Sequence, residues 1–156
     1  MIMKGSSLYI LIQLVIILLL TYGYSAHPIA YAFLLAAITY SATAMLLRKS
    51  IARHHRMGMR LVRQSNFKEA IPYFERSYKF FSKYKWVDKY RFLTLLSASG
   101  MPYSEMALGN LAFCYSQIGD GARAIEFYTK VLEENPNNGL AISGLRMLNS
   151  TKNMTT

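Results

Sequence analysis

The sequence is poor in cysteine and in acidic residues. Its single cysteine, Cys114, excludes an intramolecular disulfide and removes any CxxC or zinc-finger arrangement. Cys114 lies between Phe113 and Tyr115 in an apolar helical pattern, without the basic, exposed surroundings that make a thiol reactive. We therefore expect it to be a buried structural thiol.

The motifs of known catalytic sites are also missing. The sequence contains no phosphate loop, no HExxH and no paired nucleophile and base. The three histidines are His27 and the adjacent His54 and His55, and adjacent side chains on a helix point about 100° apart, which makes a poor metal chelator. The eight carboxylates are scattered at positions where we expect solvated surface charge. These absences predict no enzyme, no cofactor and no metal site.

Two long runs carry no charge at all. Residues 5–24 and residues 29–47 are 20 and 19 residues long, and only "SAHP" separates them. Since about 20 apolar residues cross the hydrocarbon core of a bilayer, residues 1–49 predict a transmembrane helical hairpin. A cleaved signal peptide is the alternative for the first run, but Tyr24 stands where the cleavage site needs a small residue and a second run follows at once.

The charges beside these runs predict their orientation. Arg48, Lys49 and Arg53 directly follow the second run, Lys4 precedes the first, and the connecting loop has no Lys or Arg. By the positive-inside rule both termini face the cytoplasm, as in a multi-pass integral membrane protein. We also assign Arg48, Lys49 and Arg53 to lipid headgroups.

Small residues in the second run predict close packing of the hairpin. Ala32 and Ala36 are spaced four apart, which lets a second helix approach. In an antiparallel hairpin Gln13 falls at the depth of Tyr40 and Ser41, where we expect its amide to find a hydrogen-bond partner.

The net charge of +10 is local. Residues 48–91 hold 13 Lys and Arg against three acidic residues, and the rest of the chain is balanced. Three interpretations stay open for the basic stretch: a topology signal that also contacts lipid headgroups, a nucleic-acid site, and a basic groove for acidic peptides. Its position directly after an apolar run favours lipid over nucleic acid, so we expect no nucleic-acid partner.

The stretch "LAFCYSQIGDGARAIEFY" at residues 111–128 places small residues between large apolar ones in a helical segment. As one 34-residue unit, residues 105–138 resemble the tetratricopeptide repeat, a hairpin of two helices that touch at the small positions. Asp120 is placed to cap the second helix. The residues that carry the resemblance are Leu108, Leu111, Ala112, Tyr115, Gly119, Ala124, Tyr128 and Pro136.

A second, degenerate unit precedes it at residues 51–84, with Gly58, Ala70 and Phe74 in the same phase. Residues 85–104 separate the units as an insertion with a short helix that "SASGMP" ends. We expect a capping helix at 139–149 and a disordered tail at 150–156. The predicted fold class is all-α: a membrane hairpin in 1–49 followed by a tetratricopeptide-like domain in 50–149.

The resemblance also implies a binding surface, because the first helix of each such repeat lines a concave groove for partner peptides. We expect a membrane-anchored adaptor or scaffold at the cytoplasmic membrane face, with an unidentified protein partner and membrane lipids. The alternative is a structural or self-associating membrane protein whose basic helix grips anionic lipid, and a homo-oligomer stays open. By repeat phase the groove residues are His55, Arg56, Met59, Arg63, Met106, Asn110, Phe113 and Gln117.

Overall fold

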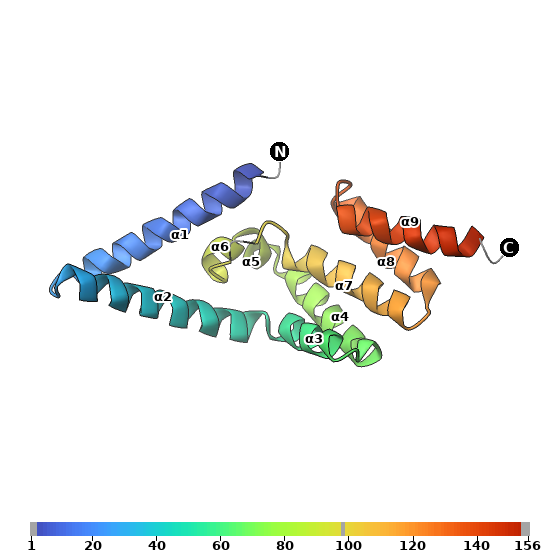
Figure 1. The fold of residues 1–156 in the computed structure, drawn as a ribbon, viewed down its shortest axis with the longest axis horizontal. Helices are drawn as coiled ribbons and strands as arrows, with labels where there is room; N and C mark the ends of the chain where they lie inside the picture. The colour runs from blue at the N-terminus through green and yellow to red at the C-terminus, as the bar shows by residue number, and fades with distance from the viewer. Residues whose placement is uncertain (1–2, 98, 154–156) are drawn as a thin grey trace. The chain divides into compact units, whose positions relative to one another are not determined.

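The computed structural model describes the backbone of residues 3–97 and 99–153 and the side chains of residues 10–97 and 99–150. All regular elements in these ranges are helices, and they divide into two compact units, Met1–Arg53 with Trp86–Pro102 and His54–Lys85 with Tyr103–Thr156 (Figure 1). The helices are α1 (Met3–Gly23), α2 (Ile29–Ile51), α3 (Arg53–Arg63), α4 (Phe67–Lys83), α5 (Lys85–Lys89), α6 (Arg91–Thr94), α7 (Tyr103–Gln117), α8 (Gly121–Glu134) and α9 (Gly139–Asn153).

In the first unit, α1 and α2 pack against each other and diverge from their short connection (Figure 1). The buried residues of α2 are Ala32, Ala36 and Ala44, which share one face of the helix. The hydroxyl groups of Tyr24 and Thr39 join the two helices by a hydrogen bond of 3.0 Å. Small side chains thus lie on one face of α2, as the sequence predicts.

The expectation for Gln13 is wrong. Its buried Nε2 has no hydrogen-bond partner among the residues described. Ser41 is exposed and stands off the alanine face of α2, so it does not offer its hydroxyl to α1. The amide nitrogen of Gln13 is therefore an unsatisfied polar atom inside the hairpin, which costs stability.

The insertion belongs to the first unit and not, as expected, to the repeat domain. Arg48, at the end of the uncharged run of α2, donates from Nε to the carbonyl of Leu95 at 3.0 Å and from its Nη2 to the carbonyl of Leu96. Leu96 is buried with a φ of 45°, a strained value for a leucine. The Arg48 side chain therefore has two protein carbonyls as hydrogen-bond acceptors, in addition to the headgroup contact that the sequence predicts.

The insertion is also built as two short helices around a buried arginine. Arg91 donates to the carbonyls of Ser99 and Gly100, both at 2.9 Å, and of Asp88 at 3.1 Å. Asp88 and Arg91 are both buried, which corrects the expectation that the carboxylates are solvated. One side chain thus organises the loop that the sequence "SASGMP" only marks as a break.

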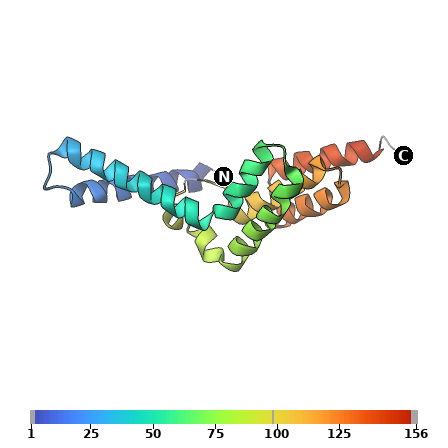
Figure 2. The same ribbon diagram turned by 90° about the horizontal axis from the view of Figure 1, so that it is seen from below.

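The second unit is a layered array in which α4 packs on α7, α7 on α8 and α8 on α9 (Figure 2). Within the first helical pair, a Cβ on Gly58 would lie 2.8 Å from the ring of Phe74, which is fully buried. A Cβ on Gly144 of α9 would lie 2.6 Å from the ring of Tyr128. The array closes because glycine lets these helices approach aromatic rings directly.

The turns of the two helical pairs match in position. Gly119, between α7 and α8, has a φ of 82°, and Ser65, which stands 54 positions earlier between α3 and α4, has a φ of 59°. Asp120 accepts a hydrogen bond from the backbone N–H of Arg123 at 3.1 Å, so its predicted capping role is confirmed.

The last helix is longer than predicted. α9 runs from Gly139 to Asn153, so the expected disorder is wrong for residues 150–153, while 154–156 lie outside the described residues. Asn138 begins the helix by accepting from the backbone N–H of Ala141 at 2.9 Å. No glycine or proline follows Gly144 to end it.

Candidate functional site

One face of α3 is charged and exposed. Arg53, Arg56, Arg60 and Arg63 are spaced three, four and three residues apart, which places them on one side of the helix. All four are exposed, α3 contains no acidic residue, and none of the four has a hydrogen bond or ion pair to any side chain that the structure describes. We name this set the arginine face. Four unpaired guanidinium groups attract anionic groups and suit planar carboxylates.

The predicted groove residues divide by exposure. Arg56, Arg63, Phe113 and Gln117 are exposed, whereas Met59, Met106 and Asn110 are half-buried. Phe113 meets the ring of Phe67 edge-on, with 5.7 Å between ring centroids. The outward part of the predicted set therefore consists of two arginines on α3, and of Phe113 and Gln117 on α7.

His55 is buried, so its assignment to an accessible groove is wrong. Its ring lies edge-on to Phe74 at 5.5 Å and to Tyr103 at 5.2 Å between centroids, and the hydroxyl of Ser77 is 3.4 Å from Nδ1. These contacts come from α4 and α7. His55 is therefore a core residue that joins three helices.

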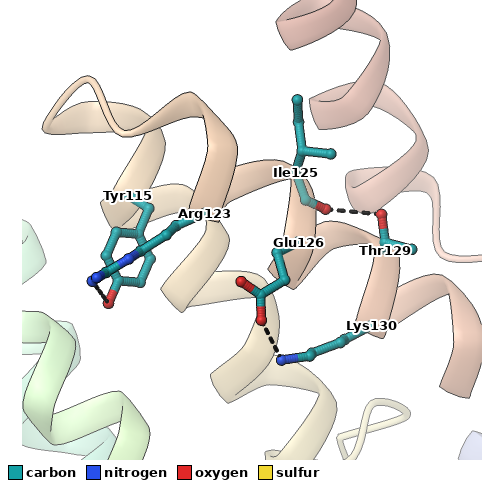
Figure 3. A network of polar contacts seen from close by, with 6 residues as sticks. All are labelled: Tyr115, Arg123, Ile125, Glu126, Thr129 and Lys130. Atoms are coloured by element: carbon teal, nitrogen blue, oxygen red, sulfur yellow. Dashed lines mark hydrogen bonds and ion pairs between the residues drawn. The ribbon is translucent and has the colours of Figure 1, made fainter.

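A second polar cluster lies on α7 and α8, and the sequence analysis missed it (Figure 3). Arg123 donates from Nη1 to the hydroxyl of Tyr115 at 3.2 Å, and this hydrogen bond raises the pKa of Arg123. Phe127 stacks on Tyr115, and Lys130 lies over the ring of Phe127. Lys130 also pairs with Glu126 at 2.6 Å. The spacing of Arg123, Phe127 and Lys130 on one helix face was the available signal.

This cluster differs from the arginine face in its charge. Arg123 lies 3.6 Å from a carboxylate oxygen of Asp120, and Lys130 has Glu126. Each cation is thus balanced by a neighbour, and exposed pairs of this kind hold their own helix more than they attract a ligand. The arginine face remains the better candidate for binding an anionic partner.

Comparison with protein families matches residues 106–138 to the tetratricopeptide repeat. Residues 106–138 are a tetratricopeptide repeat. The match covers α7 from Met106 onward, the whole of α8 and the connection of residues 135–138 that leads to α9. Comparison with curated proteins and with solved structures gives no match.

The structure of the matched repeat agrees with its signature. Leu108, Leu111, Ala112 and Ala124 are fully or almost fully buried, and Gly119 has the positive φ that favours glycine. Gly58, 54 positions before Ala112, fills the same small position between α3 and α4. The α3–α4 pair therefore has the geometry of a tetratricopeptide hairpin in the phase of the matched repeat.

The repeat phase also explains where the arginine face stands. Arg53 and Arg60 occupy the positions of Ala107 and Cys114 in α7, which are fully buried, and Cys114 packs in one cluster with residues of α4. In the matched repeat these positions face the preceding helix. α3 follows α2 in the chain and not another repeat helix, so arginines can replace the small apolar residues there.

The position of Asn110 can also be compared with the equivalent position one repeat period later. It lies 34 residues before Gly144, whose position in α9 is pressed against Tyr128 of the preceding helix. The half-buried Asn110 thus belongs to a position that faces the previous helix. Less of the Asn110 side chain is therefore accessible to a bound peptide than the repeat phase implies.

A buried carboxylate, that of Glu105, links the start of the tetratricopeptide repeat to its end by hydrogen bonds. Glu105 Oε1 accepts hydrogen bonds from the side-chain amides of Asn135 and Asn138, both at 2.7 Å. Glu105 and Asn138 are buried, which again corrects the expectation of solvated carboxylates. The bonds fasten the first turn region of α7 to the connection between α8 and α9.

The thiol of Cys114 is fully buried, as predicted. Burial raises its pKa to about 11, so the thiol is protonated and unreactive at neutral pH. Within the described part of the chain, no three His, Cys, Asp or Glu side chains are grouped to hold a metal ion.

Proposed function

We propose that this protein is a membrane-anchored adaptor whose tetratricopeptide unit binds an acidic segment of a protein partner. The observation that carries the proposal is the arginine face, four exposed guanidinium groups on α3 that have no partner among the side chains described. Repeat arrays act as protein-binding platforms, and their surface chemistry selects the ligand.

The anchoring part rests on α2 and α1. In the described residues α2 is the one helix long and apolar enough to cross a bilayer, and the apolar stretch found in α1 is Ile10–Gly23. The uncharged run of residues 5–24 supports α1 as a second span, and the flanking basic residues support cytoplasmic termini. Large apolar side chains of both helices are exposed, among them Leu18, Leu19, Tyr31, Leu34 and Leu46.

The binding part rests on charge and exposure. Carboxylates of a partner would pair with Arg56, Arg60 and Arg63, while the half-exposed Phe113 offers an apolar contact on α7. Met59, Met106, Asn110 and Gln117 complete the proposed surface at its edges. Such complementarity raises the rate of association and selects acidic partners.

The test compares two charge reversals in the intact protein held in lipid nanodiscs. Arg56→Glu with Arg63→Glu reverses the arginine face, and Lys68→Glu with Lys79→Glu makes the same change of charge on exposed positions of α4. Crosslinking followed by mass spectrometry should find a partner with the parent and with the lysine variant, but not with the arginine variant. Equal capture by all three would contradict the proposed surface.

Binding of anionic lipid is the second candidate function, because Lys49 near the end of α2 and Arg53 at the start of α3 are both exposed. In that case anionic phospholipid would copurify with the parent, and Lys49→Gln with Arg53→Gln or high salt would reduce its amount. Arg56→Glu with Arg63→Glu would then change the amount of lipid that copurifies, and crosslinking would capture the same proteins as with the parent.

A further inference from the structure

The outward face of the insertion is apolar and aromatic. Trp86 lies on α5, Tyr90 between α5 and α6, and Leu93 on α6, and the three are 60%, 44% and 50% exposed. Val87, Asp88 and Arg91 on the other side are buried. The insertion therefore buries the charged side chains of Asp88 and Arg91 and exposes a tryptophan, the reverse of what a helix surrounded by water favours. We name Trp86, Tyr90 and Leu93 the aromatic face.

Hydrogen bonds on the buried side of the insertion keep the aromatic face on its outer side. The three bonds from Arg91 to the carbonyls of Asp88, Ser99 and Gly100 hold the buried side together. Thr94 adds a bond of 2.8 Å to the carbonyl of Val87. Because the inner side is committed to these bonds, the insertion cannot turn the aromatic face inward without leaving a buried charge unpaired.

The insertion is attached at one particular end of the apolar helices. Arg48 is the first charged residue after the uncharged run of α2, and it binds the carbonyls of Leu95 and Leu96 just beyond α6. α6 also contacts α1. The aromatic face thus belongs to the same compact unit as the apolar helices and lies near the point where α2 becomes polar.

We propose that the aromatic face lies in the interface of a phospholipid bilayer, between headgroups and acyl chains. Tryptophan and tyrosine concentrate at this depth, where an apolar ring and a polar edge are both satisfied. Lys89, exposed beside Tyr90 with its ammonium 5.5 Å from that ring, supplies a positive charge for anionic headgroups. The inference rests on the membrane anchoring proposed above and adds a second contact with the same bilayer.

Trp86 is the only tryptophan of the chain, so its fluorescence reports this site without any substitution. The full chain is reconstituted in vesicles of phosphatidylcholine and phosphatidylglycerol that contain phosphatidylcholine brominated at shallow or at deep acyl positions. We expect emission shifted to shorter wavelength than in the unfolded chain, strong quenching by shallow bromines, and weaker quenching by deep bromines and by aqueous iodide.

Two variants make the same substitution at exposed leucines. Leu93→Asp places a charge on the aromatic face and should lower the bromine quenching of Trp86 severalfold, because a carboxylate resists entry into lipid. Leu140→Asp alters a leucine of α9 that is 74% exposed, and it should leave the quenching unchanged.

Flotation of the vesicles separates this inference from the proposed function. If the chain floats with the vesicles while iodide alone quenches Trp86, the anchoring stands and the inference is overturned, which leaves the aromatic face for a protein. If the chain does not float, the anchoring itself fails and the inference fails with it. Equal quenching in Leu93→Asp and the parent would also overturn the inference.

Discussion

The two units of this chain distribute their side chains in opposite ways. In the repeat unit Phe74, Leu108 and Leu111 are buried, and most charged side chains are exposed. In the unit of α1, α2 and the insertion, large apolar residues such as Leu34 and Trp86 are exposed. The exposed apolar side chains of the unit of α1, α2 and the insertion support the membrane anchoring proposed above.

The same contrast separates the contacts that hold each unit. Apolar burial around tightly apposed helices closes the repeat unit, with Gly58 and Gly144 each against an aromatic ring. The insertion is held by guanidinium groups bound to carbonyls, from Arg48 and Arg91. We therefore expect the two units to respond differently when a charged side chain is removed.

The largest effect is expected for Arg91→Met. It removes three hydrogen bonds from a buried charged donor and leaves the carbonyls of Ser99 and Gly100 unsatisfied. We expect the first unit to lose roughly 3 kcal/mol of stability. Hydrogen exchange of α5 and α6 in nanodiscs measures this loss. Arg60→Met, on the exposed arginine face, is the matched control and should stay within about 0.5 kcal/mol of the parent. Similar losses in both variants would break the contrast between buried and exposed arginines.

Glu105→Ala tests a buried charged side chain in the repeat unit, where most charged side chains are exposed. The change leaves the buried amides of Asn135 and Asn138 without their shared acceptor and loosens the start of α9. We expect a loss of about 2 kcal/mol, seen first as faster hydrogen exchange in α9. Glu126→Ala removes an exposed pair with Lys130 and should cost only about 0.3 kcal/mol. If the two substitutions cost the same, the Glu105 bonds add nothing beyond a surface pair.

Much of the repeat unit could be predicted because its signals are local. Small residues at Ala112 and Ala124, and Gly119 in the turn, follow from the spacing within one hairpin, and the family match over residues 106–138 confirms the repeat. Asp120 needed only its own helix to be recognised as a cap. The exposed arginines of α3 could likewise be found from their spacing, because residues three and four apart lie on the same side of a helix.

The rest depends on partners distant in sequence. The bonds of Arg48 to Leu95 and Leu96 span the whole first repeat hairpin, so composition could not assign the insertion to the first unit. His55 looked like a surface residue by phase, yet Tyr103 of α7 covers it. Whether a residue lines an accessible surface depends on which helix packs beside it, and a single period of sequence does not contain that information.

The smallest expected effect compares one backbone conformation in the two units. Ser65 and Leu96 both have positive φ, at 59° and 45°, where glycine is less strained. Ser65 is exposed, so Ser65→Gly removes strain and no contact, and the repeat unit should gain about 0.5 kcal/mol. Leu96 is buried, so Leu96→Gly loses an apolar side chain and should destabilise the first unit in spite of the relieved strain. Denaturant unfolding followed by hydrogen exchange in each unit measures whether each substitution raises or lowers the free energy of unfolding. A gain in both variants would mean that the buried Leu96 side chain contributes little, and that the insertion depends on its hydrogen bonds and not on apolar burial.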